Sequence, residues 1–255
     1  MMKLFARLGL AMGLMLAANW ALCAEIDAIG LAGQQRTLSQ RIVKAWCQVG
    51  LKVQPEISRA QLDAAVRHFD DNLKALEGQQ AASVTARKAI AALHAAWTPL
   101  RAMAVGAVRQ ADAAQLDARA EEVWKAADRL ANLLQDETEM PVTRSIHLVD
   151  QLRMLSQRLV KIYMLQQWKV DNATQRGEAA RVQKEFADVL GRMRQRVHSA
   201  ALRTELDSIG LQWDWLHTVL LTEGAESFRL IMAEGGEAVL ELADQVTRMY
   251  QQPAP

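Results

Sequence analysis

The chain has 255 residues with 30 basic and 29 acidic side chains, so its formal net charge is +1. This balance excludes binding to nucleic acid or another polyanion through bulk charge. The five His and two Cys lack the spacings of metal or haem sites, and nothing resembles a nucleophile paired with a base. We therefore expect no metal, no cofactor and no enzymatic activity.

The first 24 residues have the pattern of a secretory signal peptide. Two basic residues precede an apolar run from Leu8 to Cys23, and the small residue Ala24 stands before the first acid. We expect cleavage after Ala24 and export to the periplasm as a soluble protein. The alternative is an uncleaved inner-membrane anchor, although the run is shorter than the roughly 20 residues that span a bilayer. Cleavage leaves Cys47 as a single thiol, which excludes an intramolecular disulfide.

The rest of the chain contains an internal duplication. "RTLSQRIVK" at 36–44 returns as "RMLSQRLVK" at 153–161, identical at seven of nine positions with an offset of 117. Further identities continue at this offset and, after a slip of one residue, at 116: Phe69 and Phe186, Trp97 and Trp213, Asp128 and Asp244. We therefore expect two units of domain size, 25–140 and 141–255.

The first unit is expected to be helical throughout, because good helix formers dominate and apolar residues recur at spacings of three and four. The core stripe of its first helix contains Leu38, Ile42, Ala45 and Val49. Capping patterns then predict that the next three helices begin at Ser58, Ser83 and Asp112.

The second unit repeats this plan. Pro141 is expected to start its first helix directly after the fourth helix of the first unit, without a flexible linker. Breaks near Thr174, Ser199 and Gly224 would begin the other three helices. The predicted fold class is all-α, with two tandem four-helix bundles after the signal peptide. Six Trp residues are expected to pack in the core or between helices: Trp46, Trp97, Trp124, Trp168, Trp213 and Trp215.

The polar residues of the repeated motif do not lie on the core stripe. On an ideal helix Arg36 lies opposite that stripe, on a second, partly apolar line, and Arg153 lies on the same line in the second unit. A helix that is apolar on two sides is buried on both, so we expect the two first helices to pack together. Arg36 and Arg153 would then approach each other, and like charges in a partly dry interface repel.

A small anion between the two guanidinium groups would relieve this repulsion. No acid occurs at 37–49 or 154–166, and a guanidinium suits a flat oxyanion such as carboxylate, nitrate or nitrite. The predicted ligand-binding residues are Arg36 and Arg153. Candidates for polar contacts around the ligand are Ser39, Gln40, Ser156 and Gln157. Four cations on flanking faces are expected in salt bridges or in solvent: Arg41, Lys44, Arg158 and Lys161.

The segments "AGQQRTLSQRIVKAW" and "LRMLSQRLVKIYM" resemble the first-helix motif of the PilJ-type sensory domain. This domain occurs in type IV pilus chemotaxis transducers and in the periplasmic sensors of nitrate/nitrite-responsive histidine kinases. The resemblance implies a periplasmic four-helix bundle. In the nitrate sensors the Arg before Met binds nitrate at a dimer interface, which implies this role for Arg153 and for Arg36, where Thr37 replaces the Met.

Two functions follow as alternatives. The first is a periplasmic, non-enzymatic sensory protein that binds a small oxyanion between the two repeats and acts on a membrane-bound sensor, pilus or chemosensory protein. The second is a structural or adaptor protein of a pilus or chemosensory assembly, in which the seam binds a partner helix and no small ligand.

Overall fold

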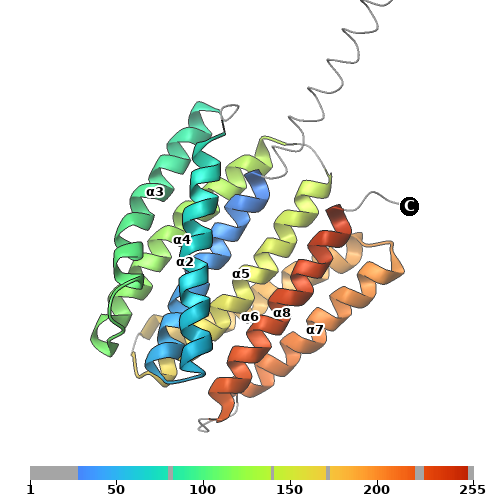
Figure 1. Cartoon of the computed structure of the whole chain (residues 1–255). Helices are drawn as coiled ribbons and strands as arrows, with labels where there is room; N and C mark the ends of the chain where they lie inside the picture. Colours follow the sequence, from blue (N-terminus) through green and yellow to red (C-terminus); the bar gives the residue numbers. More distant parts are fainter. Residues whose placement is uncertain (1–27, 80–82, 139–140, 171–172, 222–226, 252–255) are drawn as a thin grey trace, which may run out of the picture.

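A computed structural model describes residues 28–79, 83–138, 141–170, 173–221 and 227–251 (Figure 1). The predicted signal peptide and the predicted break at Gly224 lie outside these ranges. Within them there is no strand, so the prediction of an all-α fold is confirmed.

The helices follow one another with short connections. The first helix is described over 28–50. It is followed by α2 (Pro55–Glu77), α3 (Val84–Ala104), the short 3-10 helix η1 (Gln110–Asp112) and α4 (Ala113–Asp136). The remaining helices are α5 (Pro141–Gln167), α6 (Ala173–Arg196), α7 (Ala200–Leu221) and α8 (Ser227–Gln251).

The first helix and α5 lie in the middle of the molecule, with α2, α3 and α4 on one side and α6, α7 and α8 on the other (Figure 1). α3 packs on α2 and α4, while α5, α6, α7 and α8 close a ring in which each helix packs on the next. α4 also packs on α5. The boundary between units at 140/141 stays a prediction, although α5 begins at Pro141 as expected.

Both central helices are buried on two sides, as their apolar patterns predict. On the first helix, Ile42 and Ala45 of the core stripe are fully buried, and so are Ser39 and Val43 on the opposite line. α5 is buried without interruption from Leu152 to Leu165. The repeated polar motifs therefore lie inside the protein, where every charge needs a partner.

Duplicated aromatic residues form duplicated core contacts. Phe69 of α2 stacks on Trp97 of α3 with ring centroids 3.9 Å apart, and Phe186 of α6 stacks on Trp213 of α7 at 3.6 Å. Trp215 is 44% exposed, and its ring also lies against Gly235 of α8, so it takes part in packing between helices.

The predicted helix starts are right at some positions and wrong at others. Ser83 caps α3, since its Oγ accepts a hydrogen bond from the Ala86 backbone N–H at 3.0 Å. The prediction of Ser58 as a cap is wrong, because Pro55 already starts α2 and Ser58 donates to the Val53 carbonyl at 2.7 Å. Asp112 precedes α4 without a side-chain cap.

Candidate functional site

The first helix and α5 approach each other closely at Gly33. A β-carbon at this position would lie 2.1 Å from Oδ2 of Asp150. Only a glycine permits such an approach. Gly33 and Asp150 are 117 residues apart, so they occupy equivalent positions of the repeat. Gly33 of the first repeat therefore leaves the space that the Asp150 carboxylate of the second repeat fills.

Arg36 is fully buried one turn further along the first helix. Its Nη1 donates to Oδ1 of Asp128 in α4 at 3.1 Å. The Nε and Nη2 atoms have no hydrogen-bond partner in the described part of the chain. The charge of Arg36 is thus neutralised by the fourth helix of its own repeat, while two of its three nitrogens are left without an acceptor.

Arg153 has the equivalent partner and one more. Its Nη2 pairs with Asp244 of α8 at 2.5 Å, and its Nη1 donates to Oδ1 of Asp150 at 2.6 Å. Asp244 and Asp128 are themselves a duplicated pair, 116 residues apart. Its Nε lacks a partner in the same described region.

These contacts correct one step of the sequence argument. The absence of acids at 37–49 and 154–166 suggested that the two guanidinium groups would face each other without a carboxylate. The structure supplies carboxylates from α4, from α8 and from the preceding turn of α5. Neutralising Arg36 and Arg153 therefore does not by itself require an external anion.

The guanidinium groups of Arg153 and Arg36 both affect the pKa of the Asp150 carboxyl group. Burial raises the pKa of its carboxyl group, and the nearby charges of Arg153 and Arg36 oppose that rise. The side chain is only 1% exposed. Asp150 thus places a buried carboxyl group, paired with Arg153, at the contact between the first helix and α5.

The four residues predicted to surround the ligand have mainly internal contacts. Ser39 and Ser156 donate to the carbonyls of Arg36 and Arg153 at 2.7 and 2.8 Å, which fixes each hydroxyl on its own helix. The Gln40 amide donates to the Ser39 hydroxyl at 3.2 Å. The Gln157 amide donates to the Gly236 carbonyl of α8 at 2.9 Å.

Buried polar atoms without a partner gather at this junction. Within the described ranges they include Arg36 Nε and Nη2, His147 Nδ1, Asp150 Oδ2, Gln151 Oε1 and Arg153 Nε. Each such atom costs about 1–3 kcal/mol unless water or a ligand satisfies it. A concentration of them in one place is typical of a region that binds water, an ion or a ligand.

The other repeated cations connect the two repeats. Arg41 and Lys44 of the first helix pair with Glu237 of α8. Reciprocally, Arg158 and Lys161 of α5 pair with Glu121 of α4 at 2.6 Å each. These four cations were expected in salt bridges or in solvent; all four form salt bridges, and their partners were not predicted.

Residues 19–123 match the family model described as the N-terminal domain of type IV pili methyl-accepting chemotaxis transducers, PilJ. This region is similar to a PilJ-type domain. The resemblance seen in the sequence is therefore confirmed for the first repeat. No curated protein and no solved structure matches the chain.

The region that matches the PilJ family model contributes Arg36 and Gly33 to the junction, and the second repeat contributes Arg153, Asp150 and His147. No group of metal-ligating side chains occurs among the described residues. None of the helices described here is long and apolar enough to cross a membrane.

His147 gives the junction a measurable pH dependence. Burial and the charge of Arg36 lower the pKa of its imidazole to about 4. The folded protein therefore keeps His147 neutral in a pH range where the unfolded chain binds a proton, so stability is lost as the pH falls from about 6.5 toward 4. We expect NMR titration to show this His147 pKa, and His147→Gln to remove that part of the pH dependence. An imidazole that titrates near 6.5 would contradict the assignment.

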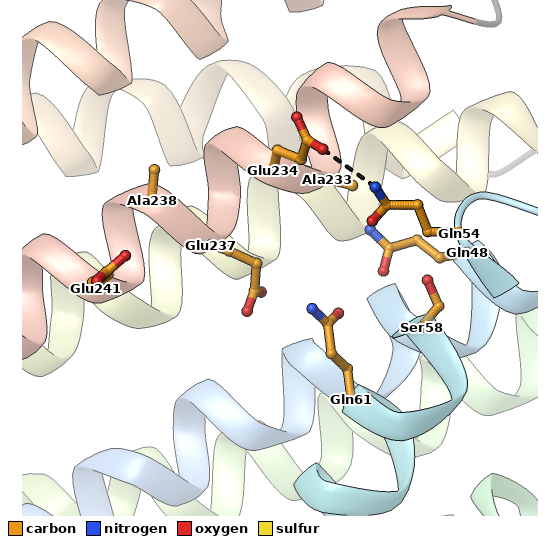
Figure 2. Close-up of a pocket in the computed structure, with 9 residues that line it drawn as sticks. All are labelled: Gln48, Gln54, Ser58, Gln61, Ala233, Glu234, Glu237, Ala238 and Glu241. Carbon is orange, nitrogen blue, oxygen red and sulfur yellow. Dashed lines mark hydrogen bonds between the residues drawn. The ribbon is translucent and has the colours of Figure 1, made fainter. Parts of the chain in front are cut away.

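A groove of about 250 Å³ lies between the region that matches the PilJ family model and α8 (Figure 2). Its lining residues are Gln48, Gln54, Ser58, Gln61, Ala233, Glu234, Glu237, Ala238 and Glu241. A second groove of about 420 Å³ occupies the equivalent place between α4, α5 and α6. Neither groove is lined by Arg36 or Arg153.

Proposed function

We propose that the protein is a periplasmic, non-enzymatic sensory protein that binds a small nitrate- or nitrite-like oxyanion between Arg36 and Arg153. One observation carries this proposal. Two buried guanidinium groups at the contact of the two central helices retain N–H groups without acceptors in the described structure. The similarity to the PilJ-type domain, named for chemotaxis transducers, supports a sensory role.

A flat oxyanion matches the chemistry of this junction. Each guanidinium presents a planar fork of N–H donors, and a monoanion can accept from both forks at once. Asp150 already occupies part of this space, so an entering anion takes over its contact with Arg153. Because Asp150 also abuts Gly33, its displacement changes the packing of the first helix on α5. Binding would thereby favour one arrangement of the two repeats over another, which a membrane-bound partner could detect.

Calorimetric titration of the mature chain with nitrate, nitrite and formate tests the proposal. We expect at least one anion to bind. Arg36→Lys and Arg153→Lys keep the charge but remove the planar fork, so each should weaken binding by about tenfold or more. Arg67→Ala, which changes an exposed Arg of α2, is the matched control and should bind as the parent does.

Circular dichroism of each variant separates loss of a ligand contact from loss of fold. The proposal fails when none of the three anions binds. It also fails when binding occurs but stays unchanged in both Lys variants.

One observation favours the adaptor alternative. Leu211 and Trp215 lie one turn apart on α7 and are 74% and 44% exposed. The equivalent positions of the first repeat hold Ala95 and Pro99. An exposed Leu and Trp on one helix suit a partner helix of a pilus or chemosensory assembly. A complex with such a protein that forms without any anion, and is lost in Trp215→Ser, would establish this function instead.

A further inference from the structure

The two inter-repeat charge clusters are equivalent in position but unequal in charge. In the cluster on α5, Lys161 pairs with Asp117 at 2.8 Å and with Glu121 at 2.6 Å. Arg158 pairs with Glu121 at 2.6 Å, and its Nε donates to Glu178 at 2.8 Å. Three carboxylates thus surround two cations.

The cluster on the first helix has lost two of these carboxylates. Arg41 and Lys44 share Glu237, the equivalent of Glu121. Ala233 stands 116 residues after Asp117, and Gln61 stands 117 residues before Glu178. One carboxylate therefore faces two cations, although Lys44 is as deeply buried as Lys161.

The lysine side chains reflect this difference. Burial lowers the pKa of the Lys44 ammonium group, and Glu237 does not offset that effect. Asp117 and Glu121 together outweigh burial and raise the pKa of Lys161. The arginines differ in the same way, since Arg158 Nε has Glu178 as its acceptor while Arg41 Nε is buried and, in the described chain, has none.

The residues that replace the two missing carboxylates line the groove of about 250 Å³. Figure 2 shows Gln61, Gln48 and Glu237 pointing toward this space from α2, the first helix and α8. Gln48 is 1% exposed, and its Oε1 is a buried acceptor without a donor in the described residues. The groove thus contains a buried acceptor that lacks a donor, Gln48 Oε1. It is also lined by Glu237, whose partner Arg41 has a buried Nε that lacks an acceptor in the described residues.

We propose that this groove binds a small zwitterion of the α-amino-acid class. The ligand carboxylate takes the place that Glu178 occupies in the other cluster and accepts from Arg41, with Gln61 moved aside. The ammonium group donates to Gln48 Oε1 and to the carboxylate of Glu234, which lies beside Gln48 in the same groove (Figure 2). This site is separate from the one proposed at Arg36 and Arg153.

The second cluster supplies the variants that test this proposal. Gln61→Glu and Ala233→Asp each insert the carboxylate found at the equivalent position of the other repeat. We expect the parent chain to bind glycine or L-alanine in calorimetric titration at millimolar concentrations, and each variant to bind at least about tenfold more weakly. Ala60→Glu, which adds a carboxylate to an exposed position of α2, is the matched control and should bind as the parent does.

Two further measurements complete the test. Acetate lacks the ammonium group and methylammonium lacks the carboxylate, so each should bind at least about tenfold more weakly than glycine. Without ligand, Gln61→Glu and Ala233→Asp should keep or raise Tm, because each gives a carboxylate to an undercompensated cluster.

Three results would overturn the proposal. They are no binding of glycine or L-alanine to the parent chain, binding that Gln61→Glu and Ala233→Asp leave unchanged, and acetate or methylammonium binding as tightly as glycine. None of them affects the oxyanion proposal, whose test uses different anions and different variants.

Discussion

Glu237→Gln is expected to lower the free energy of unfolding by about 3–5 kcal/mol, because it leaves a fully buried lysine without a carboxylate. Glu237 is the carboxylate that Lys44 and Arg41 share. Removing one partner of a buried ion pair costs more than the pair itself contributes. Chemical denaturation near neutral pH measures the loss, which should shrink as the pH rises and Lys44 gives up its proton.

Two matched variants show whether the effect comes from the buried cluster. Glu234→Gln changes the same residue type one turn earlier on α8, where the carboxylate accepts from Gln54 at the surface, and should cost less than about 0.5 kcal/mol. Glu121→Gln should cost clearly less than Glu237→Gln, because Asp117 and Glu178 remain beside Lys161 and Arg158. Equal losses in the two clusters would contradict the charge imbalance between them.

The helical fold was predictable because its signals are local. Apolar spacing of three and four identifies amphipathic helices, and Pro141 and Ser83 mark helix starts without reference to any other helix. Ser58 was misassigned because a Pro three residues earlier also starts a helix, and the backbone followed the Pro. Different capping patterns compete at helix ends. The exact first and last residues of a helix are therefore harder to predict than the presence of the helix.

The arginines of the junction were also predictable, since packing alone does not demand a repeated Arg on an apolar line. Their partners were not, because Asp128 and Asp244 are about ninety residues away in the chain. The sequence did contain a usable signal. Asp128 and Asp244 are duplicated at an offset of 116, as are Glu121 and Glu237, and each duplicated cation has a partner among these duplicated acids.

The differences between the repeats were the least predictable part. Gly33 opposite Asp150, and Ala233 in place of Asp117, read as ordinary substitutions until the fold brings them to the junction or to a charge cluster. In a protein built from two similar repeats, equivalent positions can carry different residues and charges. This is possible because each copy packs against the other copy and not against itself. The duplication therefore predicts where the charge clusters lie, and the exceptions to it predict how each cluster is charged.

Arg153→Met is expected to lower the free energy of unfolding by about 3–5 kcal/mol, since Asp150 is then buried beside Gly33 without its closest cation. Asp150→Asn should be milder, because Arg153 still pairs with Asp244. In the double variant the loss should be at least about 1.5 kcal/mol smaller than the sum of the single losses, because no buried unpaired carboxylate remains and Asp244 is half exposed. Denaturation of the four proteins gives this coupling directly.

The pH dependence of Arg153→Met distinguishes a buried carboxylate from simple loss of packing. Asp150 has a raised pKa already in the parent protein, and removing Arg153 removes the largest opposing effect. A carboxyl group whose folded pKa lies above its unfolded value destabilises the fold when ionised, and this penalty disappears as the pH falls through the folded pKa. The defect should therefore become smaller toward acidic pH and be independent of pH when Asp150→Asn is also present. A loss of unfolding free energy that is the same at every pH would mean that Arg153 stabilises the junction by packing. The Asp150 charge would then not be the group that the proposed anion replaces.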